Sequence, residues 1–84
     1  MSGVMERTLA ILERLARDVR GVPLATLADE LDIPRSATHR LLTELAEHGY
    51  VRQSRERGDY MLTTKLISLG LNYLKHSGVV DLCQ

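Results

Sequence analysis

A cluster of polar and cationic side chains between residues 34 and 48 has the spacing of one helix face. Its members are Arg35, Ser36, His39, Arg40 and Thr43. The arginine at position 40 can offer two parallel donors to guanine O6 and N7, and a serine or threonine hydroxyl can bond a phosphate or a base. The small Ala37 beside them suits contact with a thymine methyl. These residue types at this spacing predict a surface that reads base edges in double-stranded DNA.

Phosphate contacts are expected next to this surface. Arg35 and Ser36 come first in the helix, where free backbone N–H groups and the helix dipole favour phosphate oxygens. Thr26, at the start of a shorter preceding helix, is predicted to contact a phosphate rather than a base. Arg55 and Arg57 lie at the tip of a predicted hairpin, from which long cationic side chains reach the neighbouring minor groove or backbone.

Each of these side chains also has a purely structural interpretation. Ser36 could cap its helix, and Arg40 could form a surface ion pair with Glu44 four residues further on. The two arginines of the hairpin tip could serve only to keep an exposed turn soluble. His39 is expected to lie at an exposed edge and not to bind a metal.

The same residues do not form a predicted enzyme site. Ser36 and His39 are three residues apart on neighbouring helix faces, and no third partner completes a nucleophile and base. The three histidines lack the spacing of a zinc site, and no glycine-rich phosphate loop is present. We therefore predict no catalytic residue, no metal and no cofactor.

The composition is that of one small domain. Its 84 residues are 44% hydrophobic and 26% charged, with a net charge of zero. A neutral total still permits one positive face, because Asp29, Glu30 and Asp32 gather in one segment that precedes several arginines. No apolar run approaches the roughly 20 residues of a membrane span. The absence of a secretory signal and the single Cys83 predict a cytoplasmic protein.

Two helices and a turn are predicted to hold the polar cluster in place. Apolar residues three and four apart predict helices over residues 24–31 and 34–48. The second helix has an inward stripe made of Thr38, Leu41, Leu42 and Leu45. The small Ala28 lets the helices cross closely, and Asp32 tolerates the left-handed backbone that the turn needs. Residues 24–43 therefore form a helix-turn-helix motif.

The rest of the chain completes the predicted fold. A first helix over residues 4–19 ends before Gly21, and its apolar stripe is Met5, Leu9, Leu12, Leu15, Ala16 and Val19. Two short strands within residues 50–62 flank a charged tip and form a wing. A last helix over residues 63–76 is apolar on more than one side. The predicted fold class is mainly α with a small β-hairpin, a winged helix-turn-helix over residues 1–62 with a three-helix core.

In these segments the chain resembles the IclR family of bacterial transcription regulators. The matching segments are residues 4–12, 24–31, 33–42, 45–51 and 60–66, ending in Leu69-Gly70. The sequence departs from the family at Asp32, where glycine is frequent, and at Thr38, where an aliphatic residue is frequent. Neither departure forbids the fold.

The resemblance implies a homodimer and a longer protein. Dimerisation would use the helix over residues 63–76 through its apolar residues Leu66, Ile67, Leu69, Leu71, Tyr73 and Leu74. Residues 77–84 would begin a C-terminal domain that binds a small-molecule effector and is absent here. The function expected from the resemblance is a sequence-specific, homodimeric repressor that reads an inverted repeat. A winged-helix module that binds another protein instead of DNA is the alternative.

Overall fold

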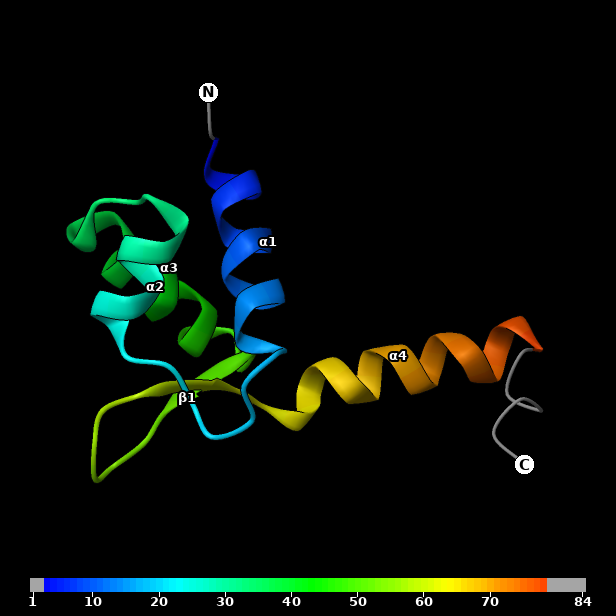
Figure 1. Cartoon of the computed structure of the whole chain (residues 1–84). Coiled ribbons are helices and arrows are strands. Elements are labelled where there is room, and N and C mark those ends of the chain that lie inside the picture. The colour runs from blue at the N-terminus through cyan, green and yellow to red at the C-terminus, as the bar shows by residue number, and fades with distance from the viewer. Residues whose placement is uncertain (1–2, 79–84) are drawn as a thin grey trace.

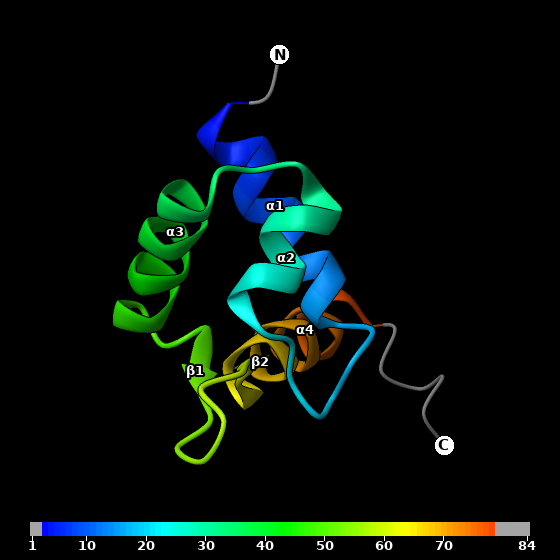
Figure 2. The same cartoon turned by 60° about the vertical axis from the view of Figure 1, so that its left-hand side comes forward.

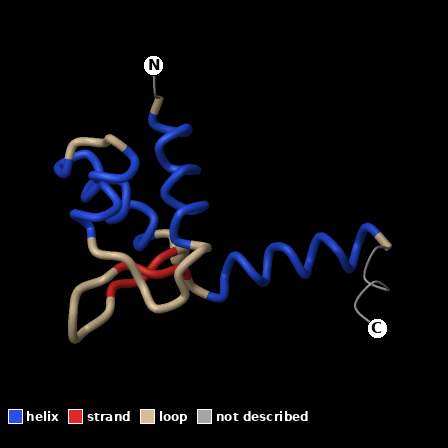
Figure 3. The backbone as a smooth tube through the Cα atoms, viewed as in Figure 1, coloured by secondary structure: helices blue, strands red, loops and turns tan. Residues whose placement is uncertain are grey.

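The computed structural model describes residues 3–78, and their elements follow the predicted order. Three helices form a body, a two-stranded hairpin lies against one end of it, and a last helix projects away from it (Figures 1 and 3). The elements are α1 (Val4–Leu15), α2 (Leu24–Leu31), α3 (Arg35–Glu47), β1 (Val51–Gln53), β2 (Tyr60–Leu62) and α4 (Thr64–Ser77). The prediction of a mainly helical winged helix-turn-helix is confirmed. The predicted start of a further domain lies, from residue 79 on, outside the described residues, as does Cys83.

The core forms where the three body helices and the hairpin meet. Its fully buried side chains come from α1, α2, α3 and the segment before α2, and they are Ile11, Leu15, Val22, Leu27, Thr38 and Leu42. Val51 and Tyr60 bring one buried side chain from each strand to the same cluster. Burial of apolar surface from every element of the body is what stabilises a domain of this size.

The first helix is shorter than the sequence pattern predicts. It ends at Leu15, and Val19, the last residue of the predicted stripe, is 90% exposed. Its inward residues are Ile11 and Leu15, whereas Met5 and Leu9 face solvent. The Asp18 side chain accepts a hydrogen bond from the Arg20 N–H and stabilises a turn in place of another helical turn. Single exposed apolar residues are normal on a protein surface. The prediction was wrong because Val19 is such a residue and happens to continue the helical spacing beyond the end of α1.

The turn between α2 and α3 agrees with the prediction. Asp32 adopts the left-handed conformation, with φ of 57° and ψ of 48°. The Ile33 N–H then donates to the Ala28 carbonyl at 2.9 Å, which closes the end of α2. Ala28 and Ile33 are both buried, so α3 crosses α2 closely. This turn fixes the direction in which α3 leaves the body.

The hairpin is shorter than predicted and pairs with a third segment. Its antiparallel register places Val51 opposite Leu62 and Gln53 opposite Tyr60. Tyr60 also exchanges two backbone hydrogen bonds with Val22, at 2.8 and 2.9 Å. The loop before α2 therefore anchors the hairpin to the body (Figure 2).

Helix α4 projects from the body and has no fully buried residue. Leu66 and Leu74 are half-buried. The other apolar side chains of the predicted dimer surface are exposed, namely Ile67, Leu69, Leu71 and Tyr73. No helix within residues 3–78 combines the length and apolar character that a membrane span requires.

Candidate nucleic-acid interface

Helix α3 separates its apolar and polar side chains onto opposite faces. The buried side holds Ala37, Thr38, Leu41, Leu42 and Leu45. The exposed side holds Arg35, Ser36, His39, Arg40 and Thr43. Leu41 is only 6% exposed while its neighbour Arg40 faces solvent, as the sequence pattern predicts. The outer side of α3 lies at the edge of the molecule, uncovered by other elements (Figure 2).

Ala37 does not belong to the exposed face, and its prediction as a DNA contact is corrected. The residue is 7% exposed and lies on the buried side of α3. It precedes Leu41 by four residues, so both side chains project from the same helix face. The methyl group of Ala37 therefore fills space against the body and is not available to a thymine methyl.

Ser36 and Arg40 do not take the structural roles that were the alternatives. Pro34 is the N-cap of α3 and no side chain caps this end, so Ser36 does not act as the cap. Among the described residues the ion pairs are Arg14–Glu30 and Arg35–Asp29, so the alternative in which Arg40 pairs with Glu44 is not observed. Both side chains are free to contact a ligand.

Arg35 is held loosely at the start of α3. Its Nη2 lies 3.6 Å from Oδ2 of Asp29, and the two side chains are 64% and 69% exposed. An exposed pair at this distance contributes little stability, because water screens it and ordering two long side chains costs entropy. The guanidinium can therefore exchange this carboxylate for a phosphate oxygen.

Charge along α3 is divided between its two halves. Arg35 and Arg40 lie on the exposed side of the N-terminal half, with the polar His39 beside them, whereas Glu44 and Glu47 are exposed towards the C-terminal end. A chain of zero net charge thus presents a local cationic surface. The N-terminal half of a recognition helix is also the half that contacts base edges in helix-turn-helix complexes.

Two of the arginines of the wing lie at its exposed tip. Arg55 and Arg57 are exposed, and Gln53 braces the tip by donating from Nε2 to the Gly58 carbonyl at 2.8 Å. Gly58 has a φ of 77°, which favours glycine. Thr26 lies in the first turn of α2 and is half-buried. The structure thus places these predicted contacts on the wing and on α2, separate from the α3 face.

Two residues that the sequence analysis did not single out connect α3 to α4. The Thr63 hydroxyl donates to the Gly49 carbonyl, and the Thr63 N–H donates to the Tyr50 carbonyl at 3.0 Å. Lys65 Nζ donates to the His48 carbonyl at 2.7 Å and lies 4.7 Å from the centre of the Tyr50 ring. No local sequence pattern predicts these contacts, because the partners are more than a dozen residues apart.

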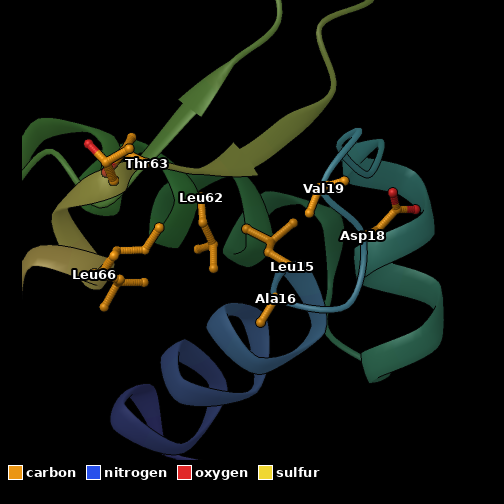
Figure 4. A pocket seen from close by; sticks show the side chains of 9 residues that line it. Leu15, Ala16, Asp18, Val19, Leu62, Thr63 and Leu66 are labelled. Carbon is orange, nitrogen blue, oxygen red and sulfur yellow. The ribbon is translucent and has the colours of Figure 1, made fainter. Parts of the chain in front are cut away.

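An apolar groove of about 350 Å³ lies between the end of α1, the end of β2 and the start of α4 (Figure 4). Leu15, Leu62 and Leu66 provide much of its apolar wall. Leu66 and Ile67 of the predicted dimer surface also line it. The apolar side of α4 therefore continues onto the body.

Comparison with known proteins identifies the fold. The model of the IclR helix-turn-helix domain matches residues 4–55, from α1 to the wing tip. The transcriptional repressor IclR of Escherichia coli is 35% identical over 71 residues, which cover 84% of this chain and 26% of that repressor. The chain spans little more than a quarter of the length of the curated relatives it matches.

Solved structures show the same architecture. The crystal structure of Pseudomonas aeruginosa HmgR has a TM-score of 0.73 and 30% identity, and the match covers 84% of this chain and 29% of that one. Cyprinid Herpesvirus3 ORF112-Zalpha, solved for its binding mode to Z-DNA, has a TM-score of 0.65 and 28% identity, over 75% of this chain and 98% of that one.

The relatives also bear on the enzyme question. They are described as transcriptional regulators and repressors, in agreement with the prediction that this domain is not an enzyme. The family match covers the three body helices and β1 in full. The chain belongs to the family of IclR helix-turn-helix domains.

Proposed function

We propose that this chain is the DNA-binding domain of a homodimeric bacterial transcription repressor, which acts in the cytoplasm and reads the major groove with α3. The observation that carries the proposal is the orientation of α3, with Leu41 buried and Arg40 exposed at the edge of the molecule. A helix held in this way fits a groove about 12 Å wide. Several relatives are named as repressors, which supports repression rather than activation.

The exposed residues divide into base readers and phosphate contacts. Arg40 reads a guanine through two parallel hydrogen bonds, and His39 and Thr43 flank it on the same exposed side. Arg35 and Ser36, at the start of α3, bind a phosphate, where backbone N–H groups without helical partners add their donors.

The remaining contacts lie outside α3. Thr26 on α2 contacts a phosphate, and Arg55 and Arg57 on the wing reach the DNA backbone or the minor groove. The Zalpha neighbour supports nucleic acid as the ligand, because a fold of the same architecture was solved bound to DNA. We propose that effector binding, which the family resemblance implies, belongs to the region of the longer relatives that lies outside this match.

Dimerisation is proposed to use α4. This helix exposes Ile67, Leu69, Leu71 and Tyr73, and an apolar surface of that kind on a projecting helix favours a second copy as its partner. Two copies related by a two-fold axis present two α3 helices, so the operator is an inverted repeat with half-sites about one helical turn apart. The residues that bind each half-site come from one copy.

The test is selection of bound sequences from random duplex DNA, followed by affinity measurements on the recovered repeat. Substitution of Arg40→Ala should cost about 1–3 kcal/mol and relax one base position. Arg17→Ala is the matched control, because Arg17 is an exposed arginine outside the helix-turn-helix motif, near Glu30. Equal affinities for the two variants would remove Arg40 from the reading role. Binding without sequence preference or salt dependence would favour the protein-binding alternative.

A further inference from the structure

Helix α4 is attached to the body through its first turn. None of its residues is fully buried, and beyond the first turn it extends away from the other elements (Figures 1 and 3). A helix held at one end swings about that end unless specific contacts fix its angle. The contacts that fix it therefore decide where the far end of α4 lies relative to α3.

Lys65 caps the C-terminal end of α3. Its ammonium group donates to the carbonyl of His48, the C-cap of α3, at 2.7 Å. The last carbonyls of a helix have no helical partner and carry the negative end of the helix dipole, so a cation is stabilising there. The same ammonium lies 4.7 Å from the centre of the Tyr50 ring, close enough for a cation–π interaction.

The backbone at Gly49 accommodates the lysine side chain. Gly49 has a φ of 86°, and a Cβ built at this position would lie 3.6 Å from Cδ of Lys65. The aliphatic part of the lysine therefore passes close to the side of Gly49 where another residue would carry its Cβ.

Thr63 connects the two helices through its hydroxyl and its backbone N–H. Its Oγ1 accepts a hydrogen bond from the Lys65 N–H at 3.3 Å and so caps α4. The same hydroxyl donates to the Gly49 carbonyl, just after the end of α3. The Thr63 N–H adds a hydrogen bond to the Tyr50 carbonyl. The end of α3 and the beginning of α4 are thereby joined by four contacts from two residues.

We infer that Thr63 and Lys65 are positioning residues that set the angle between α3 and α4, and through it the half-site spacing that the dimer reads. The inference rests on the proposed function, since only a dimer formed through α4 converts this angle into a distance between two recognition helices. Neither residue needs to touch DNA for this role. Their loss should change which spacing is preferred, and not how one half-site is read.

The angle is tested directly, without DNA. Spin labels on Ala46→Cys in α3 and Asn72→Cys in α4, both exposed positions, report the distance between the helices in a Cys83→Ser background. Dilution with unlabelled chain restricts the signal to one copy. The parent should give a narrow distance distribution and Lys65→Met a broad one. Lys75→Met, which removes an exposed ammonium from the last turn of the same helix, should leave it narrow.

A second pair of variants distinguishes the loss of the Thr63 contacts from general destabilisation of the fold. Thr63→Ser keeps the hydroxyl and should keep the narrow distribution, whereas Thr63→Val keeps the shape and should broaden it. An unchanged distribution in both Lys65→Met and Thr63→Val would overturn the inference. This readout decides the question of the angle even if the chain binds no DNA.

The spacing role is tested on inverted repeats whose spacer changes in steps of one base pair. The parent should prefer one spacer, and Lys65→Met should lose that preference while its affinity for a single half-site stays within about twofold, as for a surface substitution. A parallel loss on half-sites and full repeats would make Lys65 a phosphate contact and overturn the spacing role. If the parent binds no DNA, the proposed function fails, and the spacing role fails with it.

Discussion

Arg14 on α1 donates from Nε to Oε1 of Glu30 on α2, at 2.6 Å, and joins the two helices across the outside of the body. The hydrogen bond from Arg14 lowers the pKa of Glu30 below its usual 4.5, and burial opposes this shift only in part. A carboxyl whose pKa is lowered in the folded state stabilises the fold above its unfolded pKa, and the contribution is lost as the pH falls through the folded pKa.

Substitution of Glu30→Gln is therefore expected to lower the free energy of unfolding at neutral pH by a small amount. The parent and the variant should converge as the pH falls below 4.5, where the carboxylate of the parent becomes protonated. Urea unfolding of both proteins across this range measures the difference. A gap that stays constant down to the acid limit would mean that the ion pair does not stabilise the fold.

The turn residue Asp32 has a φ of 57°, and this gives a second prediction. Left-handed backbone costs most L-residues about 1–2 kcal/mol, and asparagine and aspartate tolerate it best. Asp32→Ala is expected to destabilise the domain by about 1 kcal/mol, whereas Asp32→Asn and Asp32→Gly should stay close to the parent. Chemical unfolding of the three variants compares them directly. Equal stability of the alanine and asparagine variants would contradict the account of this turn.

Thr38 is fully buried. The Pro34 carbonyl would keep a hydrogen-bond donor even without the Thr38 hydroxyl. That carbonyl accepts both the Thr38 N–H at 2.9 Å and the Thr38 hydroxyl at 3.0 Å. Thr38→Val keeps the hydrogen bond of the backbone N–H and the shape of the side chain. The variant loses the hydrogen bond of the hydroxyl, but it no longer buries a polar group. We expect a change within about 1 kcal/mol of either sign.

Thr38→Ala is the comparison for that variant. It also removes a buried methyl, so it should be less stable than Thr38→Val by about another 1 kcal/mol. Thermal or urea unfolding of the two variants settles the order. A valine variant as unstable as the alanine variant would show that the hydroxyl matters more than the packing.

Much of the fold could be predicted because its determinants are local. The 3.6-residue spacing gave α2 its correct bounds and placed Leu41 inside and Arg40 outside, and Asp32 marked the turn by its backbone preference. The end of α1 was missed because Val19 prolonged the spacing although it faces solvent. Ala37 was misplaced because a small residue suits both a buried face and an exposed one.

The contacts between the end of α3 and the start of α4 could not be predicted from local sequence patterns. Lys65 and His48 are 17 residues apart, and their contact requires the whole wing to bring α4 back to the end of α3. Likewise, Val22 reaches Tyr60 only once the hairpin packs on the body. Spacing along the chain specifies faces of single elements, whereas contacts between distant segments depend on how those elements pack.

The wing gives the last prediction, which concerns salt. If Arg55 and Arg57 each neutralise a phosphate, removing them releases fewer counterions on binding. The slope of the logarithm of affinity against the logarithm of salt concentration should then fall by about 1 for each lost contact. The Arg55→Ala and Arg57→Ala variants are measured singly and together on the selected operator, with Arg17→Ala as the control. Affinity should decrease to a similar extent on operator and unrelated DNA, because phosphate contacts carry no sequence information. An unchanged slope in the double variant would leave the two arginines as part of an exposed turn that does not touch DNA.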